Sequence, residues 1–214
     1  MSNPIIVMEL VAFVFSLFTF LPGNEKTLRW FSVILCIICL AEFLAVIWLG
    51  YFGKNNVFIY NLLEPIFTLG YVWIIRTFLK NVKYRRWVAN LAIVYFLGFC
   101  FNLSIGQGLQ HWNTYTILVG ACFILATVCL AFMEISNYSY QVSLGRVPLF
   151  WVSCAMLVYF FPSAVFTASY EFFTITPEFA KAYGSAYSFS QRILNVFHYG
   201  LLSYSFVCRL IFKV

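Results

Sequence analysis

Carboxylates and a histidine inside apolar segments are the residues of this sequence that could do chemistry. Glu9, Glu42 and Glu64 each lie within a long hydrophobic stretch, and His198 lies in another. An ionisable side chain inside a bilayer costs about 2.5–3.5 kcal/mol on insertion scales, so it is expected to face other protein groups. Glu64 and His198 could act as acid and base on a substrate, or the carboxylates could bind an ion or a small molecule.

Polar side chains recur at helical spacing around two of these residues. The third apolar segment carries a stripe made of Tyr60, Asn61, Glu64, Thr68 and Tyr71. The last apolar segment carries a second stripe, made of Gln191, Asn195, His198 and Ser205. Steps of three and four residues place side chains on one face of a helix, and in lipid a polar face must point inward. The stripes predict a polar cavity lined by the first, second, third and seventh apolar segments.

The residues that we predict to bind a ligand share a similar depth in the membrane. They are Glu64, Asn61, Glu42, His198, Asn195, Arg192, Glu9 and Tyr159. For Glu64 three roles are open: a structural pair with Arg192 or His198, contact with a ligand or ion, and catalysis.

The sequence predicts neither a metal centre nor a cofactor, and no catalytic residue is assigned. Three Glu and one His could hold a metal, but no HExxH or similar ligand spacing occurs. The pair Cys36-x-x-Cys39 lies within an apolar segment without flanking ligands, so we interpret it as helix packing.

The elements that must position these residues are membrane-spanning helices. Hydrophobic residues make up 63% of the 214 residues and charged residues only 9%, whereas soluble domains average about 25% charged residues. We predict an all-α fold, a single domain (1–214) of seven transmembrane helices. The helices are expected at about 5–21, 28–50, 57–79, 87–104, 112–134, 148–170 and 188–211. Within this length we expect no soluble effector domain.

Basic residues predict the orientation of the bundle. Ten of the thirteen Lys and Arg residues fall on one side of the membrane in this arrangement, namely Lys26, Arg29, Arg76, Lys80, Lys83, Arg85, Arg86, Arg146, Arg209 and Lys213. The positive-inside rule then places the N-terminus outside and the C-terminus in the cytoplasm.

The net charge of +6 is explained by this asymmetry, and we expect no nucleic-acid partner. The turn Lys80–Arg86 is interpreted as an anchor to anionic lipid, with docking of a partner protein as the alternative.

The long connection 171–187 contains a pattern typical of a helix start. Thr176 can cap a helix whose first residue is Pro177, and Gly184 is a plausible end. We expect a short outer surface helix of about two turns, acting as a connector or as a lid.

Four segments carry a resemblance to a known family. They are IYNLLEPIFTLGYVWIIRTFLKN, WNTYTILVGACFILA, PLFWVSCAMLVYFFPSAVF and ILNVFHYGLLSY. They resemble a large, poorly characterised family of bacterial seven-helix proteins, which look like stand-alone membrane modules or the membrane sensor parts of histidine kinases. The resemblance implies a sensing or signalling role and transfers no catalytic residues.

These observations favour a receptor-like or sensor module of a bacterial inner (cytoplasmic) membrane. Its outer-half pocket would bind a small molecule, a lipid or an ion. Its output would pass to a protein partner on the cytoplasmic side, and a homodimer is a further arrangement to test. A small transporter or channel, and an intramembrane lipid-modifying enzyme, are the alternatives, and we favour a role that is not enzymatic.

Overall fold

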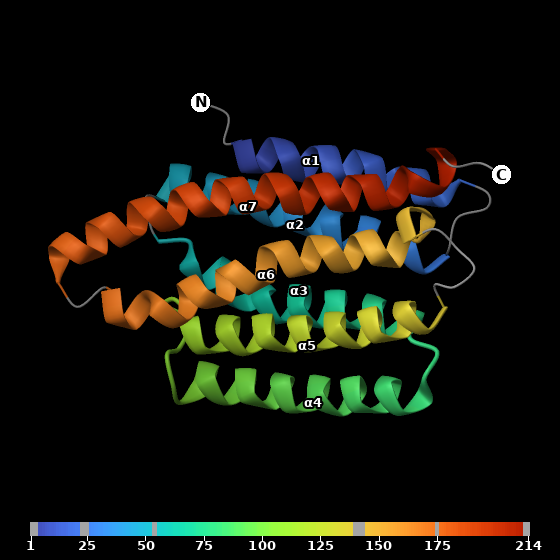
Figure 1. The fold of residues 1–214 in the computed structure, drawn as a ribbon. Coiled ribbons are helices and arrows are strands. Elements are labelled where there is room, and N and C mark those ends of the chain that lie inside the picture. Colours follow the sequence, from blue (N-terminus) through green and yellow to red (C-terminus); the bar gives the residue numbers. More distant parts are fainter. Residues whose placement is uncertain (1–3, 22–25, 53–54, 139–143, 174–175, 212–214) are drawn as a thin grey trace.

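A computed structural model of the chain describes residues 4–21, 26–52, 55–138, 144–173 and 176–211. Within these ranges the fold is all-helical, with seven α-helices and three short 3₁₀ turns, and no strand occurs there (Figure 1). The α-helices are α1 (Pro4–Ser16), α2 (Arg29–Phe52), α3 (Val57–Phe78), α4 (Val82–Ser104), α5 (Thr114–Tyr138), α6 (Pro148–Phe173) and α7 (Pro177–Ile211). The prediction of an all-α fold with seven helices is confirmed.

Within the described residues, five helices are long and apolar enough to cross a membrane, as expected of an integral membrane protein. They are Lys26–Phe52, Val57–Phe78, Val82–Ser104, Thr114–Asn137 and Pro148–Tyr170. The first predicted span is a shorter apolar helix, Ile5–Phe20, formed by α1 and the 3₁₀ turn that follows it. Helix α7 is not among the five because the polar residues of its stripe lower its mean hydropathy. Three of these residues, Gln191, Asn195 and His198, have buried side chains.

Six of the helices form a closed ring. Neighbours pack against each other in the order α1, α2, α3, α5, α6, α7, and α7 returns to α1. Helix α4 lies outside this ring, against α3 and α5, and forms one edge of the bundle in Figure 1. The ring encloses an interior whose two halves differ in character.

One half of the interior is a packed apolar core. Phe31 of α2 and Phe206 of α7 are fully buried, and their ring centroids lie 5.8 Å apart. Leu35, Ile75 and Met156 are likewise fully buried in the same cluster. This core lies toward the end of the bundle where α2 begins and α7 ends (Figure 1). It leaves the opposite half of the ring for polar side chains.

The turn between α3 and α4 is held by a buried carboxylate. Glu134 of α5, 6% exposed, accepts hydrogen bonds from the backbone N–H groups of Lys80 and Asn81. Asn81 then caps α4, because its side chain accepts from the N–H of Lys83 at 2.9 Å. Helix α4 therefore begins at Val82 and not near residue 87 as expected, and the basic residues that follow Val82 belong to its first turns.

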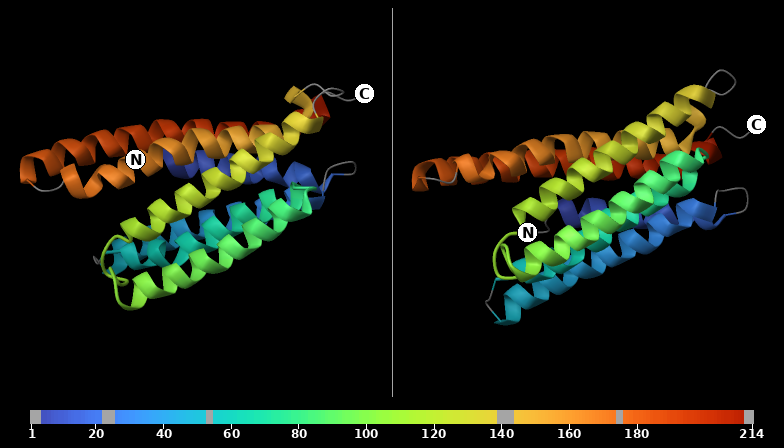
Figure 2. Two further views of the ribbon diagram at one scale, coloured as in Figure 1. Left: turned by 60° about the horizontal axis from the view of Figure 1, so that its bottom comes forward. Right: turned by 90° about the horizontal axis from the view of Figure 1, so that it is seen from below.

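Helix α7 differs from the prediction in the connection 171–187. The predicted start is correct, because Thr176 Oγ1 accepts a hydrogen bond from the N–H of Phe179 at 3.4 Å. The predicted end at Gly184 is wrong, since α7 continues without a break to Ile211. Gly184 does not adopt the positive φ that ends many helices. The expected short surface helix is thus the first part of α7, and beside the end of α6 it extends past the other helices (Figures 1 and 2).

Candidate functional site

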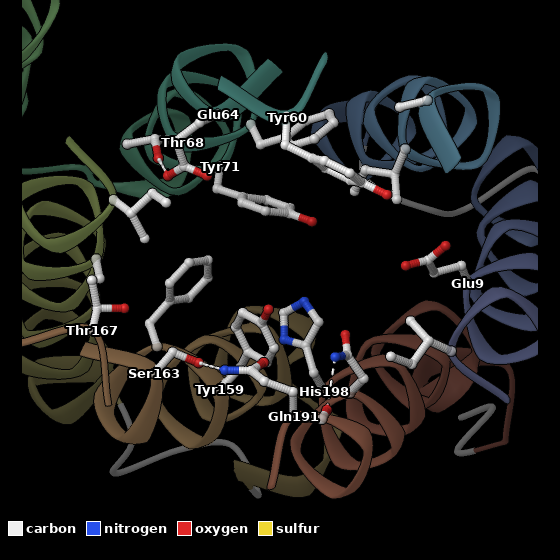
Figure 3. A pocket seen from close by; sticks show the side chains of 18 of the residues that line it. Glu9, Tyr60, Glu64, Thr68, Tyr71, Tyr159, Ser163, Thr167, Gln191 and His198 are labelled. Carbon is white, nitrogen blue, oxygen red and sulfur yellow. Dashed lines mark hydrogen bonds between the residues drawn. The ribbon is translucent and has the colours of Figure 1, made fainter. Parts of the chain in front are cut away.

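The half of the ring away from the apolar core contains a cavity of about 320 Å³. Its walls come from all six ring helices and from Trp112, which lies just before α5 (Figure 3). Small-molecule sites in proteins have volumes of about 300–1,000 Å³. The cavity is therefore large enough for a small ligand.

Glu9 of α1 carries an unpartnered polar atom in the wall of this cavity. The side chain is only 3% exposed, and Oε1 accepts a hydrogen bond from the Tyr199 hydroxyl at 3.2 Å. Oε2 is buried and has no hydrogen-bond partner in the part of the chain that the structure describes. Figure 3 shows the carboxylate pointing into the open space. Buried polar atoms are nearly always hydrogen-bonded, so an unpaired one in a cavity wall is suited to a ligand.

Glu42 of α2 is half-buried beside α3. Tyr60 donates a hydrogen bond from its hydroxyl to Oε2 of Glu42 at 3.2 Å, and both residues line the cavity. Tyr60, which belongs to the polar stripe of α3, thus contacts a carboxylate of the preceding helix, α2.

Glu64 of α3 lies on another wall of the cavity, across from Glu9 (Figure 3). Its Oε1 accepts a hydrogen bond from Thr68 Oγ1 at 3.0 Å. The pair packs against the backbone of α5 at Gly120, where an added Cβ would lie 2.9 Å from Thr68 Oγ1 and 3.3 Å from Glu64 Oε1. The same Cβ would lie 3.1 Å from the hydroxyl of Tyr95 in α4, a buried oxygen for which no described residue is a hydrogen-bond partner. The absence of a side chain at Gly120 is what lets these groups meet.

His198 of α7 is 3% exposed and surrounded by aromatic rings. Its Nδ1 lies 3.0 Å from the carbonyl oxygen of Ala155 in α6. A carbonyl can only accept, so Nδ1 carries the proton and a neutral ring would present the lone pair of Nε2. The rings of Tyr159 and Tyr199 lie 4.9 and 5.0 Å from the imidazole, centroid to centroid.

The remaining polar groups of α7 bond within the wall. Gln191 donates from Nε2 to Ser163 Oγ of α6 at 3.1 Å, which ties α6 to α7 (Figure 3). Asn195 donates from Nδ2 to the carbonyl of Gln191 at 2.8 Å. Both line the cavity, and one of the two N–H groups of each amide is engaged in these bonds.

Asn61 lines the cavity, yet its amide holds the connection between α4 and α5. It donates to the carbonyl oxygens of Leu109 and His111 at 3.0 and 2.7 Å, and its Oδ1 accepts from the N–H of Asn113 at 3.3 Å. The side chain is 1% exposed. Asn61 therefore has a structural role that the sequence did not predict, since nothing in its spacing reveals a partner some 50 residues away.

Arg192 does not belong to this site. Its side chain is exposed and lines a separate surface depression with Lys181 and Ser188. The proposed structural pairs of Glu64 are not formed: Arg192 lies outside the cavity, and His198 bonds to Ala155. Arg192 lies three residues before Asn195, at the edge of the polar face of α7, and its side chain is exposed.

Seven of the eight predicted site residues thus line one cavity: Glu9, Glu42, Asn61, Glu64, Tyr159, Asn195 and His198. The prediction of its walls was incomplete, because α5 and α6 contribute as well as α1, α2, α3 and α7. The aromatic lining was largely missed. It comprises Tyr60, Phe67, Tyr71, Trp112, Tyr159, Phe160, Tyr187 and Tyr199. In a chain with 26 Phe and 14 Tyr, composition does not distinguish these rings from lipid-facing ones.

The charge of the lining has one sign. Three carboxylate side chains reach the cavity, whereas in the described part of the chain no Lys or Arg lines it. The carboxylates do not gather at one point, and no three His, Cys or acidic side chains within the described ranges could hold a metal ion.

A second chamber of about 460 Å³ adjoins the cavity. It lies between the start of α5 and the extended parts of α6 and α7, and it is lined by Tyr170, Tyr183 and Gly184 among others. Trp112, Thr167 and Tyr187 line both spaces. The second chamber therefore meets the cavity at these three side chains, which form the junction between the two spaces.

Fold and site together define a helical integral membrane protein with an internal cavity of acidic and aromatic character. Comparison with known proteins adds no family: no family model, curated protein or solved structure matches the chain significantly.

Proposed function

We propose that the protein is a receptor-like or sensor module that binds a small ligand in the cavity between its ring helices. The observation that carries this proposal is the buried carboxylate of Glu9, which lines a cavity of ligand size and points toward its open space (Figure 3), and whose Oε2 has no hydrogen-bond partner among the described residues. A structural carboxylate would be expected to find a second donor among the polar side chains nearby.

We further propose a seven-span topology with the N-terminus outside and the C-terminus in the cytoplasm of a bacterial inner membrane. Two observations support it. The start of α1 and the end of α7 lie at opposite ends of the bundle (Figure 1). The basic residues Lys80, Lys83 and Arg85 lie at the end away from the cavity, which under the positive-inside rule is the cytoplasmic end. The cavity would then open toward the outside.

A transporter or channel is the first alternative. It would need a polar path through the half of the ring that Phe31 and Phe206 fill. A lipid-modifying enzyme is the second alternative, with Glu64 and His198 as acid and base. It is disfavoured because Glu64 is bonded to Thr68 and His198 to Ala155, and the two do not form a hydrogen-bonded pair.

The proposal is tested by native mass spectrometry of the protein purified in mild detergent, together with thermal unfolding against a panel of small molecules. A co-purifying molecule, or a compound that raises the unfolding temperature in the wild type and not in Glu9→Gln, is the expected result. Uptake of the same compound into proteoliposomes would instead favour transport. A flat response across cationic, neutral and anionic compounds, with no co-purifying species, would contradict the sensor proposal.

Signal output is tested separately, because a sensor of this kind needs a partner. Photo-crosslinking in native membranes from the exposed Lys83, in the first turn of α4, is expected to capture a protein partner or a second copy of the chain. The same probe at the membrane-exposed Leu97 of α4 is the control.

A further inference from the structure

We propose that the ligand of the cavity is a small organic cation, an ammonium group attached to an apolar body. This inference deepens the proposed function and rests on it. It specifies the chemical class that the walls of the cavity would select.

The first argument is charge. The carboxylates of Glu9, Glu42 and Glu64 reach the cavity from three helices, and no Lys or Arg of the described residues lines it. The histidine of the lining, His198, is hydrogen-bonded through Nδ1 to the carbonyl oxygen of Ala155. Oε2 of Glu9 lacks a donor although it is buried. A buried carboxylate without a counter-charge is costly, and a bound cation would supply both the charge and the missing hydrogen-bond donor.

The second argument is the aromatic surround. Tyr71 extends between the walls that carry Glu9 and Glu64, and its hydroxyl points into the open space (Figure 3). Tyr159 stands next to His198, and its ring is perpendicular to that of Phe160 at 5.0 Å between centroids. Aromatic rings around an acidic group are the arrangement by which proteins bind ammonium groups, because ring faces attract cations.

Other ligand classes fit less well. An anion would meet three carboxylates without an opposing charge. A bare metal ion would need at least three convergent ligands, and the described residues offer no such group. A wholly apolar molecule would leave Oε2 of Glu9 without a donor, and an unsatisfied buried acceptor is costly. An ammonium group would pair with the acidic side chains of the cavity, and its apolar body would pack against the aromatic ones.

The experiment compares cations with neutral molecules of the same shape. Choline is paired with 3,3-dimethylbutanol, and phenethylammonium with 2-phenylethanol, and phenylacetate is the anionic probe. Binding is measured with the full chain in nanodiscs, by the shift in unfolding temperature and by titration of tryptophan fluorescence, for which Trp112 lies in the wall. We expect at least one cation to bind with a Kd at least about tenfold lower than that of its neutral partner.

Two substitutions locate the effect. Glu9→Gln is expected to remove the preference for the cation over its neutral partner. Glu134→Gln makes the same change at a buried carboxylate outside the cavity and is expected to keep the preference. If Glu9→Gln fails to fold, Tyr159→Leu serves instead, with a loss of affinity for the cation that exceeds the loss for the neutral molecule.

The outcomes separate the two proposals. Equal binding of cations and neutral partners, or tighter binding of phenylacetate, would overturn the cation class and leave a ligand-binding module in place. A cation preference that survives Glu9→Gln and Tyr159→Leu would also overturn it. Failure of every probe to bind, with no co-purifying molecule, would overturn both the cation class and the proposed function.

Discussion

The hydroxyl of Tyr199 in α7 donates a hydrogen bond to Oε1 of Glu9 in α1 at 3.2 Å. The two residues are 190 positions apart, and their bond joins the first and last helices where the ring closes. It also holds the carboxylate of Glu9 in the wall of the cavity, where the group points toward the open space (Figure 3). A single contact thus contributes to both ring closure and the geometry of the site.

We predict that Tyr199→Phe lowers stability by about 0.6–1.7 kcal/mol, the range for hydrogen bonds between membrane helices. The loss arises because both oxygens of Glu9 are then left without a donor. Thermal unfolding in nanodiscs measures it. Tyr115→Phe, which changes an exposed tyrosine of α5, is the matched control and should have little effect. Equal stability of Tyr199→Phe and the wild type would show that the bond contributes nothing to ring closure.

Gly120 gives a prediction about packing. Gly120→Ala would place a Cβ 2.9 Å from Thr68 Oγ1, in a region where Glu64 and Tyr95 also crowd. Overpacking of this kind costs about 1–3 kcal/mol. The control is Gly200→Ala in α7, where a Cβ meets nothing within 4 Å and the substitution should be neutral or slightly stabilising.

The double variant Gly120→Ala with Thr68→Ala separates crowding from other causes. Removing the hydroxyl that lies nearest the new Cβ should recover part of the lost stability, as measured by the same unfolding assay. A double variant less stable than the sum of the two single changes would contradict the proposed clash.

Asn61→Ala should release the connection between α4 and α5. The side chain makes three hydrogen bonds to backbone groups of residues 109–113, and an alanine makes none of them. We expect hydrogen–deuterium exchange at residues 106–113 to rise by at least about tenfold, since one lost bond of 1.4 kcal/mol corresponds to that factor. Asn90→Ala on the exposed face of α4 should leave exchange there unchanged. Protection that persists in Asn61→Ala would show that the connection is held elsewhere.

Tyr187 should control the rate of ligand exchange. It lies at the junction of the cavity and the second chamber, together with Trp112 and Thr167. Tyr187→Ala widens that junction, so association and dissociation rates for a cation probe should both rise while Kd changes less. Stopped-flow fluorescence measures the rates. Phe189→Ala changes an aromatic residue that is 67% exposed in the same helix, and it should leave both rates unchanged.

The sequence was sufficient for those features that depend on local pattern. Apolar runs located seven helices, and helical spacing identified the faces of α3 and α7 that carry Glu64 and His198. It was not sufficient for features set by tertiary partners. The role of Asn61 depends on carbonyls in a distant connection, and the position of α4 outside the ring depends on which helices pair. Gly184 is a residue type that often ends helices, but here it does not adopt the positive φ of such an end, and α7 continues through it.

The apolar core that contains Phe31 and Phe206 closes the cavity at one end. The second chamber adjoins the cavity toward the other end of the bundle. A solute in a cavity with a single opening leaves by the path through which it entered. Under the proposed topology, the occupancy of the cavity at equilibrium would follow the concentration of the solute on the outer face of the membrane alone. A protein built in this way can measure a concentration without dissipating a gradient.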